Sequence, residues 1–114
     1  MRFIPTGVHG ALDYTTAVGL MALPLSLRLS STVGRLLTGA GLGTILYSVM
    51  TRYELGLVPI LPMKAHLAID MGSGLFLGVS PWILGVDEGR EKGLLLGIGL
   101  FEIVVASLSK TKPS

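Results

Sequence analysis

Residues 4–13 read IPTGVHGALD, residues 61–70 read LPMKAHLAID, and the two stretches align without a gap at an offset of 57 residues. Both carry proline at the second position, histidine at the sixth and aspartate at the tenth. Proline, histidine and aspartate are scarce in apolar sequence, so their recurrence in one register indicates a duplicated unit. We expect repeat 1 to cover about residues 1–53 and repeat 2 about residues 54–114.

The alignment continues beyond these stretches. At the same offset the pairs Leu20/Leu77, Pro24/Pro81 and Leu27/Leu84 match, and a gap of one residue brings Gly41 and Gly43 over Gly97 and Gly99. Each repeat contains two apolar segments joined by a short polar connector. Each repeat is therefore predicted to be a helical hairpin.

The composition favours a membrane protein. Of 114 residues, 14% are charged and 50% hydrophobic, and the mean hydropathy is +0.71. A soluble domain normally has about a quarter of its residues charged. An unusually apolar soluble helical domain is the alternative. The basic residues are scattered singly, which argues against a nucleic-acid surface, and the absence of cysteine excludes disulfides and thiolate metal sites.

The predicted fold is all-α: an integral membrane four-helix bundle made of two parallel two-helix repeats. The expected spans are about residues 11–29, 33–51, 65–86 and 93–109, each near the length that crosses a bilayer. Two spans per repeat bring both repeats into the membrane from the same side. A small excess of Lys and Arg on the side of the termini favours cytoplasmic termini. The expected location is the bacterial cytoplasmic (inner) membrane.

The paired His-x-x-x-Asp elements are the first candidate site. Residues four apart share one face of a helix, so His9 can reach Asp13, and His66 can reach Asp70. Two such pairs at equal depth could hold a metal ion, or the histidines could be axial ligands of haem b. In the structural alternative, each pair only bonds internally or anchors a helix start.

Glu102 is the second candidate site. It falls near the middle of the fourth span, where an ionisable residue suggests a proton or ion site. Alternatively, the protonated carboxyl could bond Tyr14, Tyr47 or Ser48 and need no function. Its counterpart in the second span would be Ile45 or Leu46.

Other residues are predicted to shape the helices. Pro24 and Pro81 should bend their spans, and Trp82 and Tyr53 are expected to anchor the chain at the membrane interface. Three small-residue patterns favour close helix packing: Gly39/Gly43, Gly74/Gly78 and Gly93/Gly97.

The triplet Ser80-Pro81-Trp82, the opening at Phe3–Thr6 and the two His-x-x-x-Asp elements together resemble the SPW-repeat family of small bacterial integral membrane proteins. The resemblance covers nearly the whole chain and implies a two-helix repeat in a bacterial membrane, without a settled activity. The first repeat departs from the pattern, because Leu23-Pro24-Leu25 replaces the triplet and leaves Trp82 without a counterpart.

Three functions follow as hypotheses. The first is a non-enzymatic structural or accessory subunit, whose partners are the lipid bilayer and other membrane proteins or a second copy of this chain. The second is a metal- or haem-binding protein using His9, Asp13, His66 and Asp70. The third is a small proton- or cation-coupled transporter or channel using Glu102. No catalytic residues are predicted.

Overall fold

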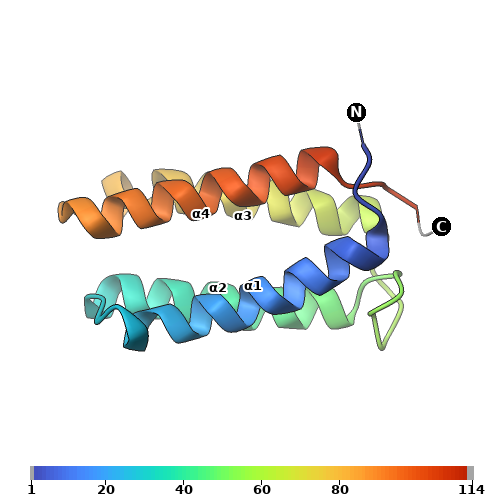
Figure 1. Ribbon diagram of the computed structural model, residues 1–114, viewed down its shortest axis with the longest axis horizontal. Coiled ribbons are helices and arrows are strands. Elements are labelled where there is room, and N and C mark those ends of the chain that lie inside the picture. Colours follow the sequence, from blue (N-terminus) through green and yellow to red (C-terminus); the bar gives the residue numbers. More distant parts are fainter. Residues whose placement is uncertain (1, 113–114) are drawn as a thin grey trace.

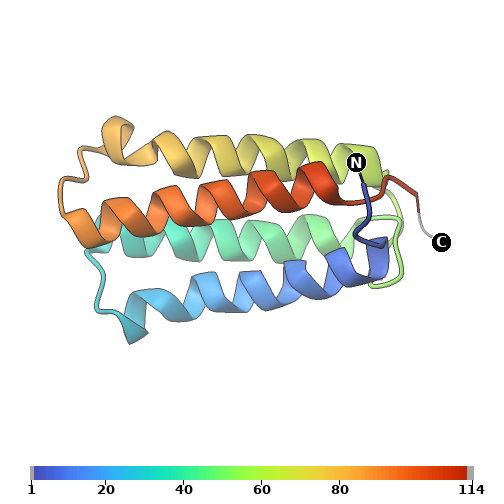
Figure 2. The ribbon, with the colours of Figure 1, turned by 45° about the horizontal axis from the view of Figure 1, so that its top comes forward.

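The computed structural model describes residues 2–112, which form four helices and no β-strand (Figure 1). The helices are α1 (Thr6–Ser26), α2 (Ser31–Val49), α3 (Met63–Leu84) and α4 (Gly89–Leu108). Helices α1 and α2 form one hairpin and α3 and α4 the other, and both chain ends lie at the same end of the bundle as the α2–α3 linker (Figure 2). The all-α prediction with four helices is confirmed.

Each helix begins earlier than the apolar pattern predicted, because polar residues contribute to the first turns. Each helix also ends one to three residues before the predicted end of its span. Helices α1 and α3 start directly after Pro5 and Pro62, whose extended backbone precedes the first turn. Ser30 caps α2 through its hydroxyl, and Glu88 caps α4 through its carboxylate.

The two helix prolines lie near the helix ends. The sequence predicts a bend at Pro24 and Pro81, and the structure places each of them in the last turn of its helix. The carbonyl of Pro24 accepts from Leu29 N–H at 3.0 Å, and that of Pro81 accepts from Val86 N–H at 2.8 Å. The prolines therefore precede the exit of the chain from the helix instead of bending the middle of a span.

The closest helix contact within each hairpin depends on a glycine. A Cβ atom at Gly99 would lie 2.5 Å from the carbonyl oxygen of Gly74 and 2.7 Å from the nitrogen of Gly78. A Cβ atom at Gly41 would lie 2.7 Å from the carbonyl oxygen of Ala17. Gly41 and Gly99 thus occupy equivalent places in the two hairpins, at an offset of 58 residues instead of the 56 that the sequence alignment assumed.

Of the six glycines predicted to pack helices, only Gly74 and Gly78 lie at a helix contact within the chain. Gly78 is at the contact through its backbone, which lies against Gly99, whereas its own Cβ position is open. The other four glycines also have no atom of residues 2–112 within 4 Å of where their Cβ would stand, and they do not appear in any close backbone contact with another glycine: Gly39, Gly43, Gly93 and Gly97.

The two hairpins are also held in the same way at the end where α1 and α3 begin. The segment before α1 pairs with the end of α4 through an Ile4–Ser109 bridge, and the segment before α3 pairs with the end of α2 through a Leu61–Thr51 bridge. The hydrogen bonds correspond: Lys110 N–H donates to Ile4 at 2.9 Å, and Arg52 N–H donates to Leu61 at 2.8 Å. The segment that leads into the first helix of each hairpin is thus fixed by the residues that follow the second helix of the other hairpin.

The opposite end has a different link between the hairpins. The carboxylate of Glu91 accepts from the backbone N–H of Ser30 at 2.6 Å and from its hydroxyl at 3.0 Å. Arg90 Nη1 donates to the carbonyl of Leu27 at 2.8 Å. Between the two ends, Leu20, Leu37, Leu77 and Leu95 belong to one apolar core.

Among the helices of residues 2–112, α3 alone is long and apolar enough, by length and composition, to cross a membrane. A single helix of this kind does not establish a membrane protein, because the core helix of a soluble protein can have the same composition. The expectation of four spans is not supported by this criterion. The polar content of the other helices is the reason: α4, for instance, begins with Arg90, Glu91 and Lys92.

A matched pair of glycine substitutions tests the packing of α4. Gly99→Ala should lower the free energy of unfolding by about 1–3 kcal/mol, because the new methyl group would overlap the backbone of α3. Gly97→Ala, two residues away on another face of the helix and with open space at its Cβ, should gain stability from better helix propensity. Thermal unfolding followed by circular dichroism measures both, and equal effects at the two positions would contradict the packing.

Candidate metal centre

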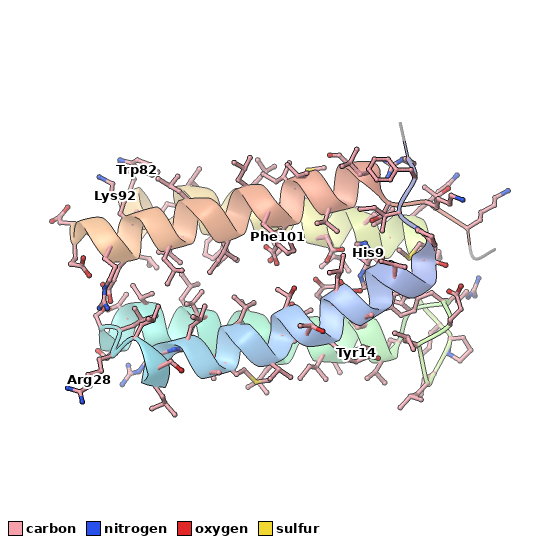
Figure 3. All side chains as sticks on the ribbon, in the orientation of Figure 1. His9, Tyr14, Arg28, Trp82, Lys92 and Phe101 are labelled. Atoms are coloured by element: carbon pink, nitrogen blue, oxygen red, sulfur yellow. The ribbon has the colours of Figure 1, made fainter. Side chains whose placement is uncertain are left out.

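The four residues of the two His-x-x-x-Asp elements form one buried cluster. His9 and Asp13 are one turn apart on α1, and His66 and Asp70 are one turn apart on α3. His9 lies between the two hairpins, near the end where α1 begins (Figure 3). Each of the four residues offers one ligand atom, and these atoms all lie within 4.8 Å of one another. The sequence-predicted ligand set is therefore brought together; hereafter it is called the His–Asp cluster.

The histidines pair across the repeats more closely than within them. His9 Nε2 lies 2.8 Å from Asp70 Oδ2 and 3.1 Å from Asp13 Oδ1. His66 Nε2 lies 2.9 Å from Asp13 Oδ2 and 3.2 Å from Asp70 Oδ2. The structural alternative, in which each pair bonds only internally, does not describe this arrangement. The cluster joins one hairpin to the other.

The other ring nitrogens are held by hydroxyl groups, again from the opposite hairpin. His9 Nδ1 lies 2.6 Å from Ser109 Oγ, and that hydroxyl donates its proton to the carbonyl of Val105 at 2.7 Å. His66 Nδ1 lies 2.6 Å from Thr51 Oγ1, which donates to the carbonyl of Tyr47 at 2.6 Å. Since a hydroxyl has one proton, both hydroxyls must accept from the rings. Both Nδ1 atoms therefore carry hydrogen, and both Nε2 atoms face the carboxylates.

Two tyrosines donate hydrogen bonds to the carboxylates of the cluster. The Tyr47 hydroxyl donates to Asp70 Oδ1, and the Tyr53 hydroxyl donates to Asp13 Oδ2 at 2.8 Å. Both rings also lie against His66, with centroids 4.7 and 5.3 Å away. Burial raises the pKa of Tyr53, which keeps its phenol protonated as a donor.

The structure corrects the expected position of one interface anchor. Tyr53 was predicted at the membrane interface, but it is buried because the linker folds back and directs its hydroxyl to Asp13. Trp82 is exposed, and the ammonium group of Lys92 lies over its ring, 5.1 Å from the centroid. Both residues lie at the bundle end opposite His9 (Figure 3).

His66 Nε2 is buried without a hydrogen bond. The Asp13 oxygen is near enough at 2.9 Å, but neither this contact nor the one to Asp70 has the direction that an N–H···O bond requires. The side chain is fully buried, so water does not compensate. The contacts of His66 Nε2 with the carboxylates are less well directed than that of His9 Nε2, which forms a hydrogen bond with Asp70 at 2.8 Å. This nitrogen is therefore the feature of the cluster that hydrogen bonding leaves unexplained.

Two charge states make the His–Asp cluster neutral. In the first, both histidines are imidazolium and balance the two carboxylates. In the second, both are neutral at Nε2, and one divalent cation balances the carboxylates. Binding of a cation would then replace two protons, as is general for metal sites that use histidine.

The donor set fits a divalent first-row metal ion. Zn²⁺ takes histidine nitrogen at about 2.0–2.1 Å and carboxylate oxygen at about 2.0–2.2 Å, usually in tetrahedral geometry, which places ligand atoms roughly 3.4 Å apart. The four His–Asp contacts are 2.8–3.2 Å long, and the ligand atoms all lie within 4.8 Å of one another. An ion would lengthen the short contacts slightly and draw the more widely separated ligands together. Hydroxyl and phenol partners already fix the orientation of the ligands, as outer partners do in known metal sites.

Haem does not fit the same residues. The rings of His9 and His66 meet edge to face with centroids 5.2 Å apart. The adjoining cavity has a volume of about 20 Å³. A porphyrin between the two imidazoles would need the hairpins to separate, so the geometry disfavours the haem hypothesis.

Glu102 is not a member of the His–Asp cluster, but it lines the small cavity beside it together with His9, Asp13 and Asp70. Among residues 2–112, the only group hydrogen-bonded to its carboxyl is the Ser73 hydroxyl, at 3.5 Å. Of the expected partners, Tyr14 donates to the carbonyl of Leu55 and Tyr47 donates to Asp70, whereas the Ser48 hydroxyl has no hydrogen bond among the described residues. At the offset of Gly41 and Gly99, its counterpart in α2 is the buried Thr44 instead of Ile45 or Leu46.

Sequence reasoning did not find the hydroxyl and phenol partners of the cluster. Thr51 and Ser109 are equivalent residues at the ends of α2 and α4, but their offset of 58 residues does not appear in the gapless alignment. Tyr47 and Tyr53 have no counterparts in repeat 2, so duplication gives no signal for them.

Comparisons of the chain with protein-family models, with curated proteins and with solved structures find no match. The resemblance to the SPW-repeat family therefore stays a prediction.

Two serines on α4 test the role of the cluster's outer partners. Ser109→Ala should cost about 1–3 kcal/mol of unfolding free energy, because it leaves the buried Nδ1–H of His9 without an acceptor. Ser107→Ala is the matched control, since that hydroxyl is exposed and bonds only its own helix, at the carbonyl of Ile103. Chemical unfolding compares the two variants. A Ser109 variant as stable as the Ser107 variant would show that the His9–Ser109 contact contributes nothing.

Proposed function

We propose that the chain is a small membrane-inserted helical bundle that binds one divalent first-row metal ion, such as Zn²⁺, at the His–Asp cluster. The observation that carries the proposal is the nitrogen of His66: it is buried, lacks a hydrogen bond and faces two carboxylates. A cation between His66 Nε2 and these oxygens would satisfy all of them at once.

The distribution of side chains supports the membrane part of the proposal. Large apolar side chains cover the outer faces of the helices, among them Leu25, Leu46 and Leu100 at 86%, 64% and 62% exposure. The buried residues include an unusually polar set: Thr6, His9, Asp13, Thr44, Ser48, Thr51, His66, Asp70, Ser80, Glu91, Glu102 and Ser109. Soluble monomers rarely expose large contiguous apolar patches. In a bilayer, apolar side chains on the outer surface of a helical bundle face lipid, and polar side chains face the interior of the bundle.

Helix length is also consistent with insertion. The helices contain 19–22 residues, which at 1.5 Å per residue gives roughly 30 Å, about the thickness of the hydrocarbon core. The exposed charges lie at the two ends of the bundle, for example Arg52 at one end and Asp87 at the other. Both features suit a bundle whose middle is surrounded by lipid.

Metal binding would act on the joint between the hairpins. Two ligands come from α1 and two from α3, and close helix contacts between the hairpins are few. A bound ion would therefore stabilise the pairing of the repeats, by about 2.7 kcal/mol when its concentration is a hundred times the dissociation constant.

The accessory-subunit and transporter hypotheses stay predictions. The feature that favours association with other chains is the open space beside Gly39, Gly43, Gly93 and Gly97, which would let a second membrane helix approach closely.

Single cysteines test membrane insertion directly, since the chain has none of its own. Leu46→Cys and Leu100→Cys, on outward faces of α2 and α4, should resist a water-soluble maleimide in membrane vesicles. Arg52→Cys and Asp87→Cys should react, each from a different side of the membrane. Equal reaction of all four would show that no lipid covers the helices and would contradict insertion.

Calorimetric titration with Zn²⁺ tests the metal site on the purified protein. The wild type should bind one equivalent, His66→Ala and Asp13→Ala should lose binding, and Ser109→Ala should weaken it by about 10–100-fold because it loosens a ligand. Asp87→Ala removes an exposed carboxylate and is the matched control. Circular dichroism verifies that each variant is folded. A wild type that binds no Zn²⁺, or equal loss in the Asp87 variant, would overturn the proposal.

A further inference from the structure

The cavity beside the His–Asp cluster has about the size of one water molecule and is lined by polar side chains together with the apolar Leu12, Phe101 and Val105. Its volume is about 20 Å³, and roughly 10–15 Å³ suffices for a water when polar partners are present. The lining includes the ligands His9, Asp13 and Asp70 together with Glu102. A buried water typically makes about three hydrogen bonds, so a water in this space can bridge the ligands and Glu102.

The polar lining of the cavity follows the internal symmetry of the bundle. Thr44 on α2 and Glu102 on α4 are equivalent positions, and both line the cavity. Thr16 on α1 also lines it, and its equivalent on α3, Ser73, donates to the Glu102 carboxyl. Four helices thus direct hydroxyl or carboxyl groups to the region next to the ligands.

Glu102 is the member of this set that packing does not explain. Its side chain is nine-tenths buried, and the 3.5 Å contact from Ser73 is its only hydrogen bond among the described residues. Thr44, at the equivalent position, satisfies its hydroxyl by donating to the carbonyl of Ala40 at 2.8 Å. A carboxyl group has no such local partner, and leaving it unpaired in the interior is costly. A water in the cavity would provide the missing partner.

We infer that this cavity holds an exchangeable water that bridges Glu102 and the His–Asp cluster, and that this water is a further ligand of the metal ion when the cluster is loaded. The inference rests on the proposed metal site and extends it. Because the His–Asp cluster already supplies four ligands, this water would be a fifth ligand, and zinc sites can expand from four to five ligands. Glu102 is then a positioning residue, which holds the water by accepting a hydrogen bond from it.

The experiment uses the full-length protein loaded with Mn²⁺ in water enriched in oxygen-17, and electron–nuclear double resonance detects an oxygen bound to the metal. The wild type should show the oxygen-17 coupling. Glu102→Leu, which replaces the carboxyl by an apolar group of similar size, should lose it. Glu102→Gln should retain it, because the amide can still bond the water.

The bound metal is measured in the same samples, which separates the two ways of failing. Metal without oxygen-17 coupling in the wild type would show a closed site and overturn this inference alone. Coupling that persists unchanged in Glu102→Leu would show that Glu102 does not position the water. A wild type without metal would overturn the proposed function and this inference with it. If Glu102→Leu does not fold, Thr44→Leu fills the same cavity from the opposite helix and should also remove the coupling.

Discussion

The crossed pairing of two imidazoles with two carboxylates is the interaction on which the rest of the structure depends. His9 contacts Asp70 more closely than Asp13, and His66 contacts Asp13 more closely than Asp70. Breaking a buried pair by removing one partner costs about 3–5 kcal/mol, because the remaining charge has no compensation. Each hairpin therefore needs the other in order to bury its own histidine and aspartate.

This dependence explains the arrangement around the cluster. The second ring nitrogens use hydroxyls at the ends of α2 and α4, and those hydroxyls are fixed by backbone bridges to the segments that precede α1 and α3. Helix ends, linker and terminus are all placed by the same set of contacts. The far end of the bundle is joined separately, through Glu91 and Ser30.

The surroundings of the His–Asp cluster depart from the internal symmetry at two places. Tyr47 and Tyr53, both from the first repeat or its linker, surround His66 and have no equivalents near His9. Glu102 in α4 occupies the position that is equivalent to Thr44 in α2. Tyr47, Thr44 and Glu102 all line the cavity, so these departures from symmetry lie where the cluster meets it.

The sequence by itself determined the helical class, the four helices and the correspondence of the two His-x-x-x-Asp elements, because the length of apolar segments, the connectors between them and the repeat register are local properties of the chain. It also placed one histidine and one aspartate on a common face of each of two helices. The fold decided what these residues contact. Cross-pairing, the hydroxyl acceptors Thr51 and Ser109, and the inward turn of Tyr53 all arise between segments far apart in the chain, where neither spacing nor composition carries a signal. The true offset of the second helices also emerged only from the close approaches at Gly41 and Gly99, since a backbone contact between helices depends on how they pack and leaves no mark in a gapless alignment.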